Sequence, residues 1–478
     1  MARLSLWVAF GCLLLVPHSF AQDVIPPGGD EGVDQAKVNE AIEKGVAWIK
    51  KQQTADGKIG VFTHEGKDYE QHYPGGTTVL GLLTLIKSGV PKDDPVIVKG
   101  FDYIKNKTTL VDPTDKDKTY CVAILILALE AINDPGGQMD EKTSVKAKNL
   151  DSEKKAWMRR LHAWLIKNRT EYESNKDGEG KPFAKPGTKY STGSSALTCI
   201  CWGYPNPNVP GTGVAPQGDA TNPIYDNSNT QIALLALKAC SRVGIETPKQ
   251  VWKGVLYHFL RLQEQDGPAV KRVGIDDSGK TTDVETDDKC RGFPYRGASD
   301  FTPNEFGWVR ATHNMVCAGL GSLLICRSEL LSDSEYKNRL APVVDTAVRD
   351  SLAWLGVMFP QFVGKPAAMD LIRKDPNPKP VDPPQPERNK RADNDPKPAG
   401  GLNYYGLYSV ERVATLAKTK NIGHSLWYAE GANKLIEVQL ADGSWGNHVS
   451  ACFALLFLKK ATFIVTGESY QERAKKKE

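Results

Sequence analysis

Two kinds of helical segment alternate along the chain, and this alternation restricts the fold more than any other feature of the sequence. One kind is amphipathic: Ile42, Val46 and Ile49 recur at helical spacing and leave the lysines of that segment on the other side. The other kind is apolar nearly all round, so it has to be covered on every side. Segments of this second kind are predicted at 79–86, 121–132, 232–240, 315–326, 410–417 and 451–458.

Six helices of each kind fit two concentric rings. The amphipathic helices are expected to begin near positions 40, 97, 155, 251, 345 and 427. We therefore predict an all-α fold, an (α/α)6 toroid in which amphipathic outer helices surround apolar inner ones. A solenoid of helix hairpins would expose the apolar helices along its concave surface. Two separate helix bundles are the other arrangement that the pattern allows.

The rest of the chain is predicted to form ends and loops around this ring. Arg3 precedes an apolar run at 4–16 that is too short to span a bilayer, and small residues follow at 19 and 21. This pattern is typical of a signal peptide cleaved after Ala21, so we expect a secreted or periplasmic protein. The predicted parts are a signal peptide (1–21), a linker (22–37), the toroid (38–465) with insertions at 170–225 and 365–400, and a basic tail (466–478).

Charge and composition exclude several classes of function. The formal net charge of +4 is small for 478 residues, and the basic residues are interspersed with acids, so no nucleic-acid surface is indicated. Phosphate-loop, Gly-x-Ser-x-Gly and His-Glu-x-x-His motifs are absent, and no cofactor is predicted. Five cysteines within apolar helical segments are predicted to be buried free thiols: Cys121, Cys240, Cys317, Cys326 and Cys452.

A short motif recurs three times: a helix that ends in glutamine and is closed by an Asp-Gly turn. The glutamine of the motif is Gln53, Gln263 or Gln439 in the three copies. The last copy continues through Asp442 and Gly443 to Trp445. This last copy resembles the glutamine–tryptophan repeat of squalene–hopene and oxidosqualene cyclases, which recurs in the related protein prenyltransferases. The resemblance implies that Gln439 and Trp445 join neighbouring outer helices, and that these repeat residues are structural.

The same resemblance predicts where an active site would lie. The cyclases carry an Asp-x-Asp-Asp-Thr motif at the start of an inner helix, and its middle aspartate is the proton donor. The matching place here is Asp226-Asn-Ser228-Asn229-Thr230, where a serine and an asparagine replace the acids. Because a hydroxyl cannot protonate an alkene or an epoxide, we expect no protonation-type cyclase activity. Alternatively, Asp226 caps the helix, and Asn229 or Gln231 binds free backbone amides.

The prenyltransferase side of the resemblance implies a zinc site. Asp288 and Cys290, with the distant His313, superficially match the ligand set of that family. The aspartate and the cysteine lie in a polar loop and not at the start of an apolar helix, so no metal is predicted.

Two functions remain open at this point. The predicted function is the binding of an apolar, isoprenoid-type ligand or of a partner at the mouth of the cavity. The alternative is a carbohydrate-active enzyme, a polysaccharide lyase or a glycosidase, whose two carboxylates would be Asp226 and Glu411. The predicted ligand-binding residues are Asp226, Ser228, Asn229, Gln231, Arg310, His313, Tyr404, Tyr405 and Glu411.

Overall fold

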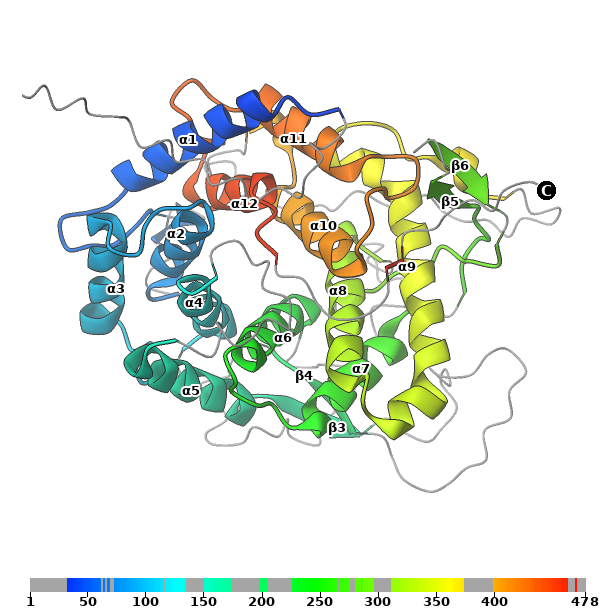
Figure 1. Ribbon diagram of the computed structural model, residues 1–478, viewed down its shortest axis with the longest axis horizontal. Coiled ribbons are helices and arrows are strands. Elements are labelled where there is room, and N and C mark those ends of the chain that lie inside the picture. The colour runs from blue at the N-terminus through cyan, green and yellow to red at the C-terminus, as the bar shows by residue number, and fades with distance from the viewer. Residues whose placement is uncertain are drawn as a thin grey trace, which may run out of the picture.

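The computed structural model describes most of the region predicted to form the toroid. The described residues are 32–61, 63–64, 67–68, 73–114, 117–134, 150–173, 198–203, 226–264, 266–275, 280–284, 286–295, 311–373, 399–462 and 469–470. Within them, the helices form an inner ring surrounded by an outer ring (Figure 1). The predicted (α/α)6 toroid is confirmed. The predicted signal peptide and the proline-rich segment 374–398 lie outside these residues.

The two kinds of helix alternate in the order predicted. The outer helices are α1 (Gln35–Lys51), α3 (Pro95–Lys107), α5 (Ser152–Lys167), α7 (Lys249–Leu262), α9 (Ala341–Phe362) and α11 (Trp427–Glu437). The inner helices are α2 (Gly76–Lys87), α4 (Thr119–Ala131), α6 (Asn227–Arg242), α8 (His313–Leu330), α10 (Tyr404–Ala417) and α12 (His448–Leu458).

Burial explains why the inner helices carry almost no polar face. Helix α4 packs between α2 and α6, and Tyr120 is its one residue that is not buried. Leu125 and Leu129 of this helix are fully buried. Burial of one such side chain stabilises the fold by about 1.5–3 kcal/mol. None of the helices in the described part of the chain has the length and apolarity that a membrane span requires.

Aspartate and asparagine side chains set where several helices begin. Asp34, Asp94 and Asp151 accept hydrogen bonds from the first backbone amides of outer helices. Asn403 and Asn447 do the same for the inner helices α10 and α12. Such caps satisfy amides that have no partner within the helix.

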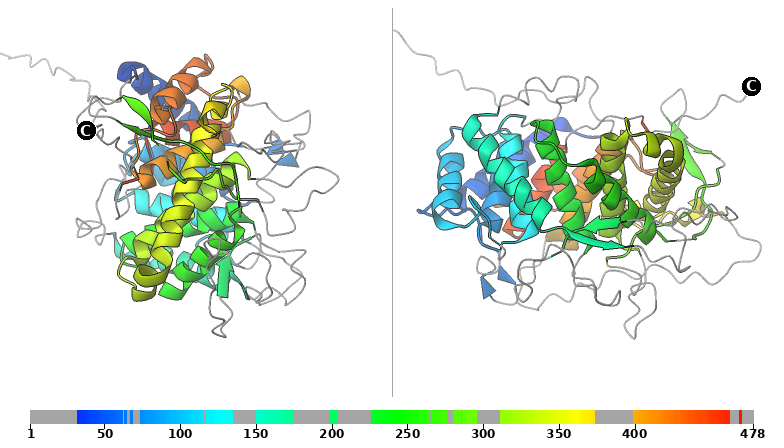
Figure 2. Two further views of the ribbon diagram at one scale, coloured as in Figure 1. Left: turned by 90° about the vertical axis from the view of Figure 1, so that its right-hand side faces the viewer. Right: turned by 90° about the horizontal axis from the view of Figure 1, so that it is seen from below.

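Short antiparallel strands connect some of the helices. The strand pairs are β1 (Thr63–His64) with β2 (Lys67–Asp68), β3 (Thr170–Glu173) with β4 (Thr198–Cys201), and β5 (Arg272–Ile275) with β6 (Thr281–Val284). Figure 2 shows β1–β2 and β3–β4 on one face of the ring. The insertion at 170–225 was predicted to be a loop, yet its first residues pair with β4 in the register Thr170↔Cys201. Ile200 of β4 packs against Gly254 of α7, where any side chain would collide with it.

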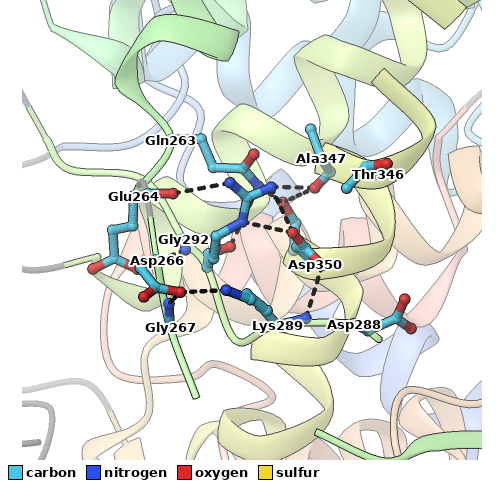
Figure 3. A network of polar contacts seen from close by, with 12 residues as sticks. Gln263, Glu264, Asp266, Gly267, Asp288, Lys289, Gly292, Thr346, Ala347 and Asp350 are labelled. Carbon is cyan, nitrogen blue, oxygen red and sulfur yellow. Dashed lines mark hydrogen bonds and ion pairs between the residues drawn. The ribbon is translucent and has the colours of Figure 1, made fainter. Parts of the chain in front are cut away.

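The three glutamines of the repeat motif connect consecutive outer helices. The side-chain amide of Gln53 donates to the carbonyl oxygen of Val96 in α3 at 2.8 Å. Gln263 donates to Ala347 in α9 at 2.9 Å, within the polar network of Figure 3. Gln439 donates to Ala41 in α1 at 2.9 Å and thereby joins the last outer helix to the first.

The Asp-Gly turns add a second connection between outer helices. In Figure 3, Asp266 lies beside Lys289, whose ammonium group is 2.6 Å away. The backbone amide of Lys289 donates to Asp350 of α9 at 2.8 Å, and Arg291 pairs with the same carboxylate. At the closure of the ring, the Trp48 indole donates to Asp442 at 3.2 Å.

A buried ionic cluster joins three inner helices at their C-terminal ends. Arg242 of α6 pairs with Glu130 of α4 at 2.6 Å and with Asp134. The ammonium group of Lys87 from α2 donates to the Asp134 carbonyl at 3.1 Å. Burial raises the pKa of Glu130 and lowers that of Lys87, while the attraction of opposite charges opposes both shifts. Three inner helices are thus held together by charges that water does not reach.

None of the eight cysteines within the described residues forms a disulfide. The five in apolar helices are also buried, as predicted.

Replacing Gln439 with leucine should weaken the closure of the ring. The carbonyls of Ala41 and Gly443 would each lose a hydrogen bond, and a hydrogen bond of this kind contributes about 0.5–1.5 kcal/mol. We expect urea unfolding to give a correspondingly lower free energy of unfolding. The exposed Gln250 of α7 supplies the matched control, and Gln250→Leu should change stability by less than about 0.5 kcal/mol. Equal effects of the two substitutions would contradict the proposed role of Gln439.

Replacing Arg242 with methionine should destabilise the fold by about 3–5 kcal/mol, because Glu130 and Asp134 would remain buried without their guanidinium partner. The charge of Arg242 lowers the pKa of Glu130, so the folded variant should take up a proton on Glu130 more readily than the folded wild type does. The difference in the free energy of unfolding between the wild type and the variant should therefore shrink as the pH falls. Urea unfolding over a series of pH values tests this, with exposed Arg159→Met as control. A deficit independent of pH would argue against the buried cluster as its cause.

Candidate functional site

Three hydroxyl groups from three different inner helices meet at the end of the ring where those helices begin. They belong to Tyr120 of α4, Ser228 of α6 and Tyr405 of α10, and we call them the hydroxyl cluster. The Tyr405 oxygen lies 3.3 Å from both the Tyr120 oxygen and the Ser228 oxygen. Tyr120 and Ser228 also hydrogen-bond to each other. All three residues are half-buried.

A second polar layer lies beneath the hydroxyl cluster. The amide nitrogen of Gln231, one helical turn after Ser228, donates to the Tyr405 oxygen. The amide oxygen of Gln231 accepts a hydrogen bond from the Arg412 guanidinium at 3.1 Å, and Arg412 also donates to Ser409 at 2.7 Å. Gln231 and Arg412 are 4% and 3% exposed, so the cation is held below the surface at this end of the ring. We call this end, where the inner helices begin, the mouth.

The buried charge of Arg412 has no carboxylate within ion-pair distance among the residues that the structure describes. Its guanidinium lies 5.6 Å from the Tyr405 ring centre and 4.5 Å from that of Tyr408. Burial opposes the charge, but the nearby oxygens of Tyr405, Tyr408 and Tyr120 raise the pKa of Arg412 above its ordinary value. A buried cation that lacks an ion partner favours negative charge or lone pairs close by. The mouth therefore suits a polar or anionic ligand.

Glu411 does not belong to this mouth. It was predicted to lie at a helix start, but α10 begins at Tyr404, so Glu411 lies in the middle of the helix. The carboxylate is fully buried and accepts hydrogen bonds from the Thr462 hydroxyl at 2.6 Å and the Thr462 amide at 3.2 Å. Burial raises its pKa to about 7, although these hydrogen bonds act in the opposite direction. Glu411 thus attaches the segment after α12 to α10.

Asp226 and Asn229 serve the start of α6. One carboxylate oxygen of Asp226 accepts from the Asn229 backbone amide at 2.7 Å, and the other accepts from the Asn229 side chain at 2.8 Å. Asp226 is 3% exposed. The two acids named for a glycosidase, Asp226 and Glu411, are therefore both engaged inside the protein, which leaves no exposed pair in the arrangement that hydrolysis requires.

The other predicted residues lie apart from the hydroxyl cluster or outside the described part of the chain. Tyr404 is buried, and burial raises its pKa. His313 lies 3.1 Å from the Gln361 side chain and packs edge-on against Trp354 of the outer helix α9. Arg310 lies outside the described residues.

Sequence reasoning missed Tyr120, Ser409 and Arg412. A signal for Arg412 was present, because it lies in an otherwise apolar helix and seven residues after Tyr405, on the same helical face. Tyr120 gave a weaker signal, as a polar aromatic residue at the start of an apolar helix. The proximity of the two could not be read from positions 292 residues apart.

The residues considered for zinc do not form a ligand set. Asp288 pairs with Arg272 through two hydrogen bonds, at 2.6 and 2.7 Å. Within the described ranges, no group of three or more His, Cys, Asp or Glu side chains is arranged to hold a metal ion.

Two solved structures that resemble the chain belong to one enzyme. No protein-family model matches the sequence, and no curated protein does. One structure is the α-1,6-mannanase GH76A of Salegentibacter sp. HEL1_6, and the other is an inactive variant of that enzyme in complex with α-1,6-mannotriose. Each has a TM-score of 0.43 and 9% sequence identity, and the match covers 89% of this chain and 98% of the mannanase chain. A likeness of this size carries no inference about activity.

The predicted relationship to terpene cyclases and prenyltransferases is wrong: no model of either family matches the sequence, and the solved structures that resemble the chain are mannanases. The predicted isoprenoid-type ligand is corrected with it. Hydroxyl and amide groups above a buried guanidinium line the mouth, and an apolar ligand would exclude water from them without offering hydrogen bonds in return. The glutamine–tryptophan motif accounts for how the outer helices are joined and says nothing of the ligand.

The raised pKa of Glu411 should make stability depend on pH. The folded carboxyl has a pKa of about 7 against an ordinary value of 4.5, so its stabilising effect is complete below pH 4.5 and is lost as the pH rises through about 7. A Glu411→Gln variant cannot ionise and should lack this loss. Relative to the variant, the wild-type free energy of unfolding should fall by about 3 kcal/mol over that range. Urea unfolding at several pH values measures the difference, and exposed Glu43→Gln should leave the pH dependence unchanged.

Proposed function

We propose that the chain is a carbohydrate-active protein that holds a saccharide polymer at the mouth of the toroid. The observation that carries the proposal is the hydroxyl cluster of Tyr120, Ser228 and Tyr405 above the buried Arg412. Phenol and serine hydroxyls both donate and accept hydrogen bonds, which matches the hydroxyl groups of a sugar. The half-buried Phe453 lies beside them, 5.4 Å from the Tyr405 ring, and offers an apolar surface for a sugar ring.

The reaction we propose is elimination and not hydrolysis. Hydrolysis of a glycosidic bond normally uses two carboxylates, whereas Asp226 and Glu411 are both engaged in internal hydrogen bonds. Elimination from a uronic-acid residue needs a base for the C5 proton and an acid for the leaving oxygen. The electron pair of the C5–H bond forms the C4=C5 double bond as the C4–O bond breaks, and the leaving oxygen then takes a proton.

Tyrosines can supply both proton transfers. In this scheme Tyr405, which lies against Arg412, reacts as its phenolate and becomes neutral as it takes the C5 proton. Tyr120 protonates the leaving oxygen and becomes a phenolate, and transfer of a proton from Tyr405 to Tyr120 across their 3.3 Å contact restores both residues. Arg412 stabilises the negative charge that builds up on the substrate near its carboxylate. Gln231 fixes the relative positions of Arg412 and Tyr405 because it hydrogen-bonds to both. Arg412 does not itself exchange a proton.

The proposal includes export from the cell, where polysaccharides are encountered. It is supported by the sequence alone: Arg3, the apolar run at 4–16 and the small residues before Gln22. Mass spectrometry of the exported protein should show an N-terminus at Gln22.

The function is tested by incubating the protein with polyuronates, a glycosaminoglycan and a neutral mannan. We expect a polyuronate or the glycosaminoglycan to give products whose new double bond absorbs ultraviolet light. Tyr405→Phe should lower kcat by about 10²–10⁴-fold. The control is Tyr257→Phe, which also removes a phenol that hydrogen-bonds to a side chain but lies on the outer helix α7. It should leave kcat unchanged.

Other outcomes would contradict parts of this scheme. New reducing ends without ultraviolet absorbance would show hydrolysis and overturn the elimination step. Failure to bind or cleave any of the polymers would overturn the saccharide proposal itself.

A further inference from the structure

We infer that a second site, at the opposite end of the ring from the hydroxyl cluster, binds a small oxyanion such as a carboxylate, phosphate or sulfate group. The site is a partly open pocket of about 120 Å³. One wall is the outer helix α9, and the other walls are the start of β5, the loop 419–423 and the residues Ser469 and Tyr470.

The position of the pocket separates it from the mouth. Arg327, which lines the pocket, lies in the last turn of α8, and the loop 419–423 follows the end of α10. The hydroxyl cluster lies at the opposite, N-terminal ends of the inner helices. The inference therefore does not depend on the proposed reaction.

The charges that line the pocket favour an anion. Four cationic side chains and two carboxylates face it, so its formal charge is +2: Lys271, Arg272, Arg327, Arg349, Asp288 and Asp345. Two of these charges neutralise each other, because Arg272 and Asp288 form a two-pronged pair at 2.6 and 2.7 Å. Lys271 lies 3.2 Å from Asp283, an aspartate outside the pocket lining.

Asp345 contacts a hydroxyl group and a cation in the wall of the pocket. Its carboxylate accepts a hydrogen bond from the Tyr470 hydroxyl at 2.6 Å and lies 3.8 Å from the Arg327 guanidinium, a long contact for an ion pair. The Arg327 guanidinium packs over the Tyr470 ring at 5.0 Å. Tyr470 thus orients both a cation and an anion in the wall of the pocket.

Arg349 is the side chain of the pocket that is best suited to bind an anion. It is exposed, it lines the pocket, and no side chain in the described part of the chain forms an ion pair or a hydrogen bond with it. It lies one turn after Asp345 on α9, yet the two side chains are not within ion-pair distance. A guanidinium presents a planar fork of donors that matches the two oxygens of a carboxylate, phosphate or sulfate group.

Two glycines let the walls of the pocket come together. Gly423 packs directly on Gly356 of α9, and a side-chain carbon at Gly423 would lie 2.6 Å from the Gly356 carbonyl oxygen. Gly423 also has a φ of +57°, which favours glycine. This contact holds the loop 419–423 against α9 at a distance that forms a pocket of defined width.

The test is isothermal titration of the whole protein with inorganic phosphate, sulfate and glucuronate at constant ionic strength in chloride. We expect saturable binding of at least one of them, and the comparison distinguishes an inorganic anion from a sugar acid. Arg349→Met should weaken that binding by about tenfold or more, and Arg349→Lys should weaken it less, because the charge remains while the fork of donors is lost. The exposed Arg159→Met on α5 should bind as the wild type does.

Separation from the mouth is tested with Tyr405→Phe, which should keep the wild-type affinity for the anion. Crystals soaked in selenate should show an anomalous peak between Arg349 and Arg327. The inference would be overturned if none of the three anions bound saturably, if Arg349→Met bound as tightly as the wild type, or if the selenate peak lay elsewhere. Loss of binding in Tyr405→Phe with full binding in Arg349→Met would place the anion at the mouth instead.

Discussion

The contact between the last and the first helix pairs, which includes the hydrogen bond from Gln439 to the Ala41 carbonyl, closes the ring, and the burial of α2 and α12 depends on that closure. Helix α12 packs against α10, α2 and the outer helix α1, so an open ring would expose α2 and α12 to water. Trp445 is fully buried next to Gly45, and a side-chain carbon there would come within 2.8 Å of the indole ring. The first and last helix pairs therefore approach more closely than helices with larger residues at this contact could.

The two ends of the ring differ because an α-helix is polar along its axis. At the C-terminal ends, where backbone carbonyls lack partners, the cations Lys87 and Arg242 are buried together with carboxylates. At the N-terminal ends, caps such as Asp226 satisfy the first amides, and the partial positive charge of the helices faces the mouth. The positive Arg412 adds to that field. A ligand rich in oxygen lone pairs is suited to the mouth, while at the other end the ionic cluster packs α2, α4 and α6 together.

The repeat motif shows how a sequence signal can be right about structure and wrong about chemistry. Gln53, Gln263 and Gln439 each reach a carbonyl of the next outer helix, as the motif implies. That contact is needed by any ring of paired helices, whatever it binds. The cyclase family was inferred from such residues, and the ligand predicted from the family was wrong. In the proposed function a few side chains at the mouth hold the ligand, and these residues are not part of the repeat.

The sequence by itself determined the ring. Twelve helical segments, alternating between half-buried and fully buried patterns, leave few other ways to cover the apolar faces. It also located the start of α6, where Ser228 and Gln231 contribute to the mouth. Only the tertiary structure decided which side chains share that mouth. Tyr120 and Tyr405 are 285 residues apart, yet their hydroxyls lie 3.3 Å from each other in the closed ring. This proximity cannot be predicted from local sequence periodicity. The tertiary structure also decided that Glu411, a plausible acid in the sequence, is buried against Thr462, because the contact joins two segments 51 residues apart.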